Sequence, residues 1–324
     1  MPAPSRDLLR RVVELATRAP SVHNSQPWLW RIVDESTVEL YADRARQLQQ
    51  ADPDGRNLMI SCGAVLQHAQ EVAEALGLLV SVHEPEQDAL RDLLAVLAFA
   101  PGRPAGDAAD RLRTLEQRCT DRRRFTSWPV PDARLTELAD AAQGWEVQAV
   151  PLNDVTARFR AELLIERALT VQAGDRRYAE EQASWVENGR QDGMPLASAS
   201  PPSSGRRLER PSRFRAWPRR DEHERVVEST DGLMALCTAD DDRSSWLRAG
   251  QALSALWLHA TRIGLSIVPL SQVVEVAQTR DALRDEVFAG LTRPQLLLRV
   301  GWQEIARTTL PRTARRPVDD VLLR

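Results

Sequence analysis

The chain has 324 residues, of which 43% are hydrophobic and 27% are charged, and its formal net charge is -3. This composition predicts a globular protein with one large or two medium domains, and it excludes a largely disordered chain. The small net charge gives no overall attraction to nucleic acid or to an anionic membrane surface. All 43 residues in the lysine-plus-arginine count are arginine, which excludes Schiff-base chemistry on a lysine.

Cysteine usage and the N-terminus bear on the compartment. Cys62, Cys119 and Cys237 are distant from one another and odd in number, and no C-x-x-C pair occurs. This pattern predicts free core thiols rather than a disulfide or zinc framework, so no metal site is expected. The N-terminal residues lack a basic region followed by an apolar stretch, and no apolar run is long enough to span a bilayer. We therefore expect a cytoplasmic protein without a membrane partner.

An amphipathic helix opens the chain and ends in a polar loop. Ser5 or Asp7 can cap this helix, whose apolar positions recur at helical spacing until Pro20. The loop that follows, APSVHNSQPW at 19–28, has five hydrogen-bonding side chains among the six residues 21–26. That density suits a binding loop, but Ser, Asn and Pro are also ordinary in a connector, so both interpretations stay open.

Helices and short strands alternate along the rest of the chain, which indicates an α+β or layered α/β fold. A hairpin is expected at 28–33 and 38–42, and Gly77 ends the long helix that follows it. In chain order the expected elements are a helix at 56–76, strands at 78–82 and 93–99, helices at 111–125 and from Asp132, a strand at 145–150, a strand at 232–238, a helix at 245–262, a strand at 265–270, a helix through Leu283 and a strand at 295–302.

Two segments of the chain match each other without a gap. GAVLQHAQEVAEALGLLV, from Gly63, aligns with GQALSALWLHATRIGLSI, from Gly250, and each helix ends in glycine. Just upstream, Asp54 and Arg56 recur at the same offset as Asp241 and Arg243. Two amphipathic helices can look alike by chance, but an internal repeat is the better explanation. We expect two related halves, residues 1–113 and 114–324.

The second half carries an insertion at about 186–225, rich in Pro, Ser, Gly and Arg, which indicates a lid or a disordered loop. Within it, residues 206–220 hold seven arginines with Phe214 and Trp217 interleaved. Such a pattern can bind single-stranded nucleic acid. The acidic DEHE follows directly, and a solvated lid explains the charges without a further partner, so no nucleic-acid partner is expected.

APSVHNSQPW after a helix, a later RVGW strand and PRTARRP near the C-terminus resemble the FMN-dependent nitroreductase family. The match covers most of both halves in sparse motifs. DPDGRNLMISCG and WLRAGQAL make the sequence most similar to the Acg-like branch, whose layout is duplicated in a single chain. The resemblance implies an α+β, nitroreductase-like layered fold in which two fused halves form an intramolecular pseudo-dimer.

The resemblance also implies an asymmetric flavin site. The family joins an R-x-S-x-R segment of one subunit to a P-S-x-x-N segment of the other. Here the first half keeps PSVHN without R-x-S-x-R, whereas the second half keeps RCTDR, with Thr for Ser, and has lost P-S-x-x-N. These complementary losses predict one FMN per chain. The monomer is then the functional flavin unit, and higher oligomers stay open.

Cofactor-binding residues are expected in four places. The resemblance points to the first loop, to the RCTDR segment and to unranked C-terminal arginines for the phosphate, which guanidinium groups can bind bidentately. A further loop follows the strand at 265–270, where strand ends can meet a ligand. The candidates are Pro20, Ser21, Val22, His23, Asn24 and Gln26; Arg118, Thr120 and Arg122; Pro269, Ser271 and Gln272; and Arg312, Arg315 and Arg316.

Some roles stay open. His23 can hydrogen-bond the flavin or pack as a neutral residue. Trp28, Trp30, Trp145 and Trp257 are expected in the core rather than stacked on a flavin, because they lie in strands or in mid-helix. No catalytic side chain is expected, since flavin N5 carries the chemistry.

Two functions follow. The first is an oxidoreductase in which NAD(P)H is the candidate reductant and a nitroaromatic or quinone is the small-molecule electron acceptor. The alternative is an FMN-sequestering, storage or regulatory flavoprotein whose lid covers the flavin, with little or no turnover.

Overall fold

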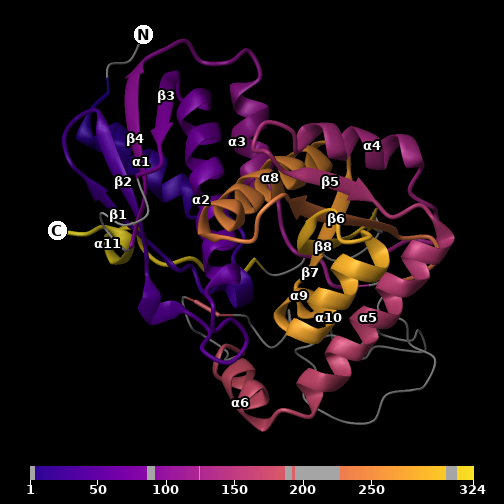
Figure 1. The fold of residues 1–324 in the computed structure, drawn as a ribbon. Coiled ribbons are helices and arrows are strands. Elements are labelled where there is room, and N and C mark those ends of the chain that lie inside the picture. The colour runs from indigo at the N-terminus through magenta and orange to yellow at the C-terminus, as the bar shows by residue number, and fades with distance from the viewer. Residues whose placement is uncertain (1–3, 86–91, 124, 187–191, 194–226, 304–311) are drawn as a thin grey trace.

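Two four-stranded antiparallel sheets with their helices make up the molecule (Figure 1). The computed structural model describes residues 4–85, 92–123, 125–186, 192–193, 227–303 and 312–324. The strand order is β1-β2-β4-β3 in the first sheet and β5-β6-β8-β7 in the second, so the two orders correspond strand for strand. The strands are β1 Trp28–Ile32, β2 Thr37–Ala42, β3 Leu78–His83, β4 Leu93–Pro101, β5 Gln148–Pro151, β6 Gly232–Thr238, β7 Leu265–Leu270 and β8 Arg293–Trp302.

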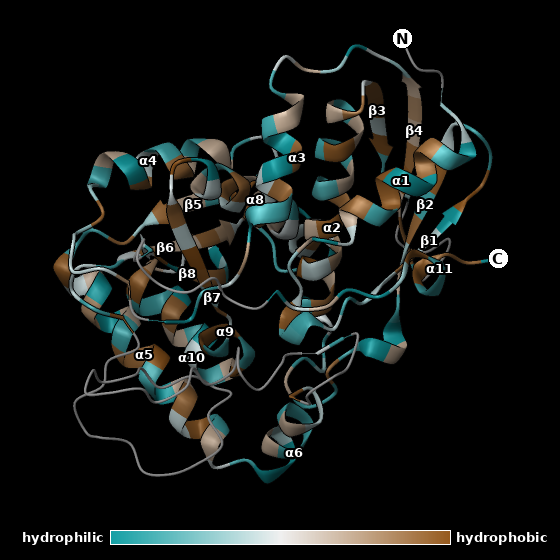
Figure 2. Ribbon diagram, turned by 180° about the vertical axis from the view of Figure 1, so that it is seen from behind, coloured by the Kyte–Doolittle hydropathy of each residue, from teal (hydrophilic) through white to brown (hydrophobic). Residues whose placement is uncertain are grey.

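The helices join these sheets into one body. Figure 2 shows hydrophobic residues along β4, β6 and β8, and buried side chains from both halves form one continuous core. The α-helices are α1 Arg6–Ala16, α2 Arg56–Ala75, α3 Ala108–Gln117, α4 Asp132–Ala141, α5 Val155–Ala173, α6 Arg176–Ser184, α8 Arg243–Arg262, α9 Gln272–Glu275, α10 Ala277–Ala282 and α11 Val318–Val321; short 3₁₀ turns lie at Val22–Asn24 and Arg44–Arg46, and a π turn lies at Leu283–Val287. None of the helices in the described ranges is long and apolar enough to cross a membrane.

The two 20-residue helices α2 and α8 pack against each other at the centre (Figure 1). A Cβ atom on Gly63 would lie 1.9 Å from the carbonyl oxygen of Leu247, and one on Gly250 would lie 2.0 Å from that of Ile60. Only glycine lets the two backbones approach this closely. Because Gly63 and Gly250 are the matched residues of the repeat, the two halves meet around equivalent positions.

Local signals place the first elements as expected. The hydroxyl of Ser5 accepts a hydrogen bond from the backbone N–H of Leu8 and caps α1. Strands β1 and β2 form the expected antiparallel hairpin, with Trp28 opposite Ala42 and Ile32 opposite Val38. The long helix expected at 56–76 is α2.

One expected helix is wrong in its extent, and three helices, α5, α6 and α11, were not expected. The helix expected at 111–125 ends at Gln117, because Arg118 leaves helical geometry and its guanidinium packs over the Trp257 ring. Tertiary contacts thus override the local pattern. Helices α5 and α6 fill the stretch before the insertion, and the helix expected through Leu283 consists of α9, α10 and a π turn.

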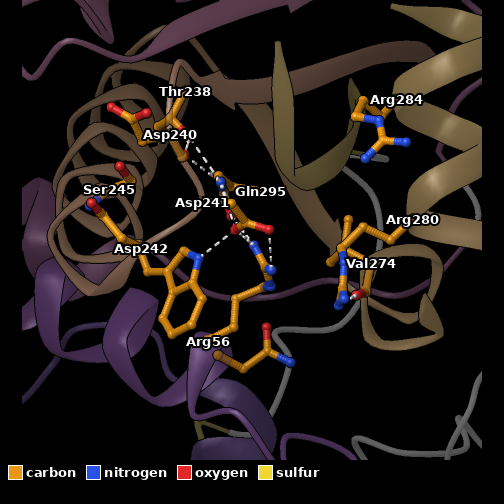
Figure 3. Close-up of polar contacts among 12 residues, drawn as sticks. Arg56, Thr238, Asp240, Asp241, Asp242, Ser245, Val274, Arg280, Arg284 and Gln295 are labelled. Atoms are coloured by element: carbon orange, nitrogen blue, oxygen red, sulfur yellow. Dashed lines mark hydrogen bonds and ion pairs between the residues drawn. The ribbon is translucent and has the colours of Figure 1, made fainter. Parts of the chain in front are cut away.

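A buried polar cluster joins the halves where α2 begins. Arg56 makes two contacts with Asp241, at 2.5 and 2.8 Å, and also donates to the side chain of Gln295 (Figure 3). The indole N–H of Trp246 donates to the same carboxylate at 2.7 Å. Burial alone would raise the pKa of Asp241, but the bonds from Arg56 and Trp246 outweigh it and lower that pKa to about 2.

The C-terminal residues return to the first half. Leu322 bridges Trp30 on β1, and the N–H of Leu323 donates to the Trp30 carbonyl oxygen at 2.7 Å. The chain of the second half therefore ends beside the first sheet.

Two expectations on organisation stay predictions. The expected division at 113/114 lies inside α3, which packs against both α2 and α8. Most of the expected lid at 186–225, including Phe214, Trp217 and the arginine-rich stretch, lies outside the described residues.

Candidate functional site

A cavity of about 110 Å³ lies between the two halves. This volume is much larger than one buried water needs, so the cavity can take part of a small molecule. It is lined by Pro20, Ser21, Val22, His23, Asn57, Ile60, Ser61, Thr120, Arg122, Leu169, Leu253, Trp257, Val268, Pro269, Leu270, Ser271, Gln272, Leu296 and Arg299.

The polar loop after α1 forms one wall. Its backbone is left-handed at His23, Asn24 and Gln26, with φ of 49°, 55° and 50°. Such φ values are uncommon for residues other than glycine, and they persist where the surroundings hold them. The Ser61 hydroxyl on α2 anchors the loop by accepting a hydrogen bond from the N–H of Val22 at 3.1 Å. His23 is buried at the cavity surface.

Asn24 and Gln26, both expected in the site, lie behind this wall and contact the C-terminal residues. Arg315 donates to Oδ1 of Asn24 at 3.0 Å, and Nδ2 of Asn24 donates to the Ala314 carbonyl at 3.0 Å. The backbone N–H of Arg316 donates to Oε1 of Gln26 at 2.8 Å. These two amides therefore fasten the C-terminal segment to the loop.

The segment after α3 forms the opposite wall. Thr120 and Arg122 line the cavity, whereas Arg118 is buried beside it, 4.7 Å from the centre of the Trp257 ring. Trp257 thus belongs to the core, as expected, but also lines the cavity and carries a cation on its face.

Arg118 and Arg315 concentrate positive charge, and no carboxylate of the described residues is in contact with them. Nη2 of Arg118 and Nη2 of Arg315 each donate to the Arg18 carbonyl at 3.2 Å. Nε and Nη1 of Arg118 have no hydrogen-bond partner among the described residues. Burial lowers the pKa of Arg118 to about 10, while burial and the charges of Arg118 and Arg18 lower the pKa of Arg315 to about 9.

Burying the Arg118 cation while two of its nitrogen donors lack an acceptor costs free energy, so the arrangement suits an anion. The fully buried His68, which the charge of Arg118 reaches, does not supply a negative charge. Its pKa lies well below the ordinary value because of burial and then the charge of Arg118, so its ring is neutral.

The other expected residues fall into two groups. Pro269, Ser271 and Gln272 line the cavity where β7 ends, and Oε1 of Gln272 is buried without a hydrogen-bond partner among the described residues. Arg312 is exposed. Arg316 pairs with Asp43 at 3.3 Å and donates to the Gln26 carbonyl, so its charge is already engaged.

Several lining residues were missed from the sequence. Asn57 and Ser61 come from α2, and Arg299 comes from β8. Asn57 follows Arg56 in the DPDGRN motif, which was a usable signal because the motif supports the family resemblance. Arg299 is the first residue of RVGW, which also supports the resemblance, so the same kind of signal was present there.

No three His, Cys, Asp or Glu side chains in the described part of the chain gather into a group that could hold a metal ion. The Asp52 carboxylate, near the cavity, instead accepts from the N–H groups of Asn57 and Leu58 at 3.0 and 2.8 Å. Burial raises the pKa of Asp52 to about 7.

The fold defines an α+β protein built as a pseudo-dimer, with a cavity between its halves and the arginine pair Arg118 and Arg315 beside it. Two curated proteins of Mycobacterium tuberculosis H37Rv are similar along almost the whole chain. "Putative NAD(P)H nitroreductase Rv3131" is 36% identical, covering 98% of this chain and 92% of the relative. "Putative NAD(P)H nitroreductase acg" is 31% identical, covering 97% and 95%. The chain therefore belongs to the nitroreductase family.

A solved structure supports the fold. The crystal structure of a "putative nitroreductase" from Anabaena variabilis aligns with 92% of this chain and 88% of its own, with a TM-score of 0.57 at 10% sequence identity. No protein-family model matches the chain.

Proposed function

We propose that the chain binds FMN in the cavity between its halves and transfers electrons from NAD(P)H to a small-molecule acceptor such as a nitroaromatic or a quinone. The observation that carries the proposal is the pair of buried Arg118 and half-buried Arg315, whose charges have no carboxylate in contact among the described residues. A phosphate ester supplies the missing negative charge.

The residues present fit such a ligand. Arg118 and Arg315 would hold the phosphate, and the cavity offers hydrogen-bonding groups on Ser21, Thr120 and Gln272 beside apolar walls for a flat ring. When bound, FMN supplies hydride chemistry at N5. The chain's own part is to bind, orient and shield the cofactor, and Arg122 would place a positive charge along the cavity wall.

One flavin per chain follows from the asymmetry of the halves. Counting from the matched Gly63 and Gly250, Ser61 corresponds to Arg248. Ser61 accepts from the cavity loop that precedes β1. Arg248 instead pairs at 3.2 Å with Glu146, in the turn that precedes β5, where the second half would carry the equivalent loop. The matched position therefore carries a bulky side chain in place of a small hydroxyl.

A second candidate function is a flavin-holding protein with little turnover. It is favoured by the described residues 192–193, which lie against the cavity loop. The backbone N–H of Gly193 donates to the Asn24 carbonyl at 3.3 Å, and Nδ2 of Asn24 donates to the Gly193 carbonyl at 2.9 Å. Asp192 pairs with Arg46. A segment held at this place can restrict access to a bound flavin.

Purified protein tests both functions. We expect bound FMN near one per chain, with NADPH or NADH oxidation above the free-FMN background when nitrofurazone or menadione is added. A protein that binds no FMN contradicts the proposal. A bound flavin that neither nicotinamide reduces supports the holding function instead.

A further inference from the structure

Arg299 is a buried cation in the middle of β8, the central strand beside β6 and β7 (Figure 1). Its guanidinium reaches the segment after α3, where Nη2 donates to the carbonyl oxygens of Arg122 and Arg123 at 3.4 and 3.1 Å. It also lies 4.4 Å from the centre of the Phe125 ring. The Arg299 side chain thus contacts the segment after α3 at two backbone carbonyls and at the Phe125 ring.

The segment needs such support because it forms no helix or strand of its own. Thr120 and Arg122 must be presented to the cavity from a chain without a regular hydrogen-bond ladder. Gly301, on the same face of β8 as Arg299, makes room for Phe125, since a Cβ atom there would lie 2.1 Å from the ring. Strand β8 is therefore shaped at two positions to receive this segment.

The first half shows that the sheet does not itself require an arginine here. Ser81 on β3 pairs with Ala98 on β4, just as Val268 on β7 pairs with Arg299 on β8. Counting from Leu78 and Leu265, the first residues of their strands, Ser81 corresponds to Val268, so Ala98 occupies the place of Arg299. The same sheet geometry is built with alanine in the half that lacks the R-x-S-x-R type of segment.

Arg299 also lies near a carboxylate of the second half. Nη1 of Arg299 is 3.9 Å from Oδ2 of Asp231, and the same Asp231 oxygen accepts from the N–H of Glu228 at 2.9 Å. Both side chains of the pair are almost completely buried. Burying a cation together with a carboxylate gives little net stability by itself, because desolvation offsets their attraction.

We infer that Arg299 is a positioning residue, which holds the Arg118–Arg123 segment in the conformation that presents Thr120 and Arg122 to the cofactor. This inference rests on the proposed function, but the chain contains a reporter that is independent of flavin. Cys119 lies in this segment and is partly exposed, whereas Cys62 and Cys237 are buried. The rate at which a thiol reagent modifies Cys119 therefore reports the order of the segment.

The test compares Arg299→Met and Arg299→Lys with the wild-type protein. In cofactor-free protein we expect Arg299→Met to speed modification of Cys119 by dithionitrobenzoate, with Arg299→Lys in between, and Cys119→Ser to remove the signal. Because hydrogen bonds from charged groups each contribute roughly a tenfold factor, the Kd for FMN should rise about tenfold or more in Arg299→Met, with partial recovery in Arg299→Lys.

Arg6→Met is the matched control, because Arg6 donates to the carbonyls of Ile32 and Val33 at the same two distances, 3.4 and 3.1 Å, and none of these three residues lines the cavity. It should change neither readout. Unchanged Cys119 modification and FMN affinity in Arg299→Met overturn the inference, even if the melting temperature falls. If the wild-type protein binds no FMN, the proposed function fails, while the Cys119 rates still decide the role of Arg299.

Discussion

The guanidinium groups of Arg118 and Arg315 share a single acceptor, the carbonyl oxygen of Arg18, at 3.2 Å each. One arginine follows α3 and the other comes from the C-terminal residues, so the pair exists only in the folded chain. Like charges at this separation repel, and the repulsion is relieved when an anion binds between or beside them.

Removing Arg118 should therefore weaken FMN binding. We expect Arg118→Ala to raise the Kd for FMN by at least tenfold, since a charge-assisted bond contributes about 1.5–3 kcal/mol. Titration of FMN fluorescence measures it. Arg113→Ala, which removes an exposed α3 arginine paired with Asp110, is the control and should bind FMN as the wild type does. Equal affinity in both variants would take Arg118 out of the site.

The glycine contact between α2 and α8 should be intolerant of a methyl group. Because a Cβ at position 63 would lie 1.9 Å from a backbone oxygen, Gly63→Ala should cost about 1–3 kcal/mol or more of unfolding free energy, as overpacking does. Urea unfolding gives the value. Gly106→Ala places its methyl in open space and should be close to neutral. A neutral Gly63→Ala would show that the helices can separate.

Asp52 predicts a pH dependence of stability with a defined sign. Its pKa is raised from 3.8 to about 7 by burial, so between these values the folded state holds more protons than the unfolded state. The free energy of unfolding contributed by this group therefore falls as pH rises from about 4 to 7, and is constant above. Asp52→Asn should flatten that slope in urea unfolding, whereas Asp132→Asn, exposed at the start of α4, should keep it. A slope unchanged in Asp52→Asn would assign the effect to other groups.

Asp241 predicts the opposite sign. Its pKa is lowered to about 2 because the bonds from Arg56 and Trp246 outweigh the effect of burial, so its stabilisation is present above pH 3.8 and is lost as pH falls toward 2. Asp241→Asn leaves Arg56 buried with a weaker partner and should cost about 1.5–3 kcal/mol at neutral pH. Glu180→Gln breaks an exposed pair with Arg176 and should cost less than about 0.5 kcal/mol. Similar losses in the two variants would argue against a special role for the Arg56–Asp241 pair.

Local signals accounted for much of the secondary structure. The hairpin of β1 and β2, the cap at Ser5 and the long helices with glycine after them follow from periodicity and capping, which act over a few residues. The end of α3 did not follow, because contacts of Arg118 with Trp257 and with the Arg18 carbonyl decide it. Both partners are far from Arg118 in sequence.

The sequence by itself determined the family, the α+β class and the repeat around Gly63 and Gly250, since these depend on residue order and spacing. Only the tertiary structure decided which polar side chains meet. It turned Asn24 and Gln26 toward the C-terminal residues, set Arg315 beside Arg118, and brought Asn57 and Arg299 to the cavity. The physical reason is that these neighbours come from separate elements, whose approach is set by the close packing of α2 against α8.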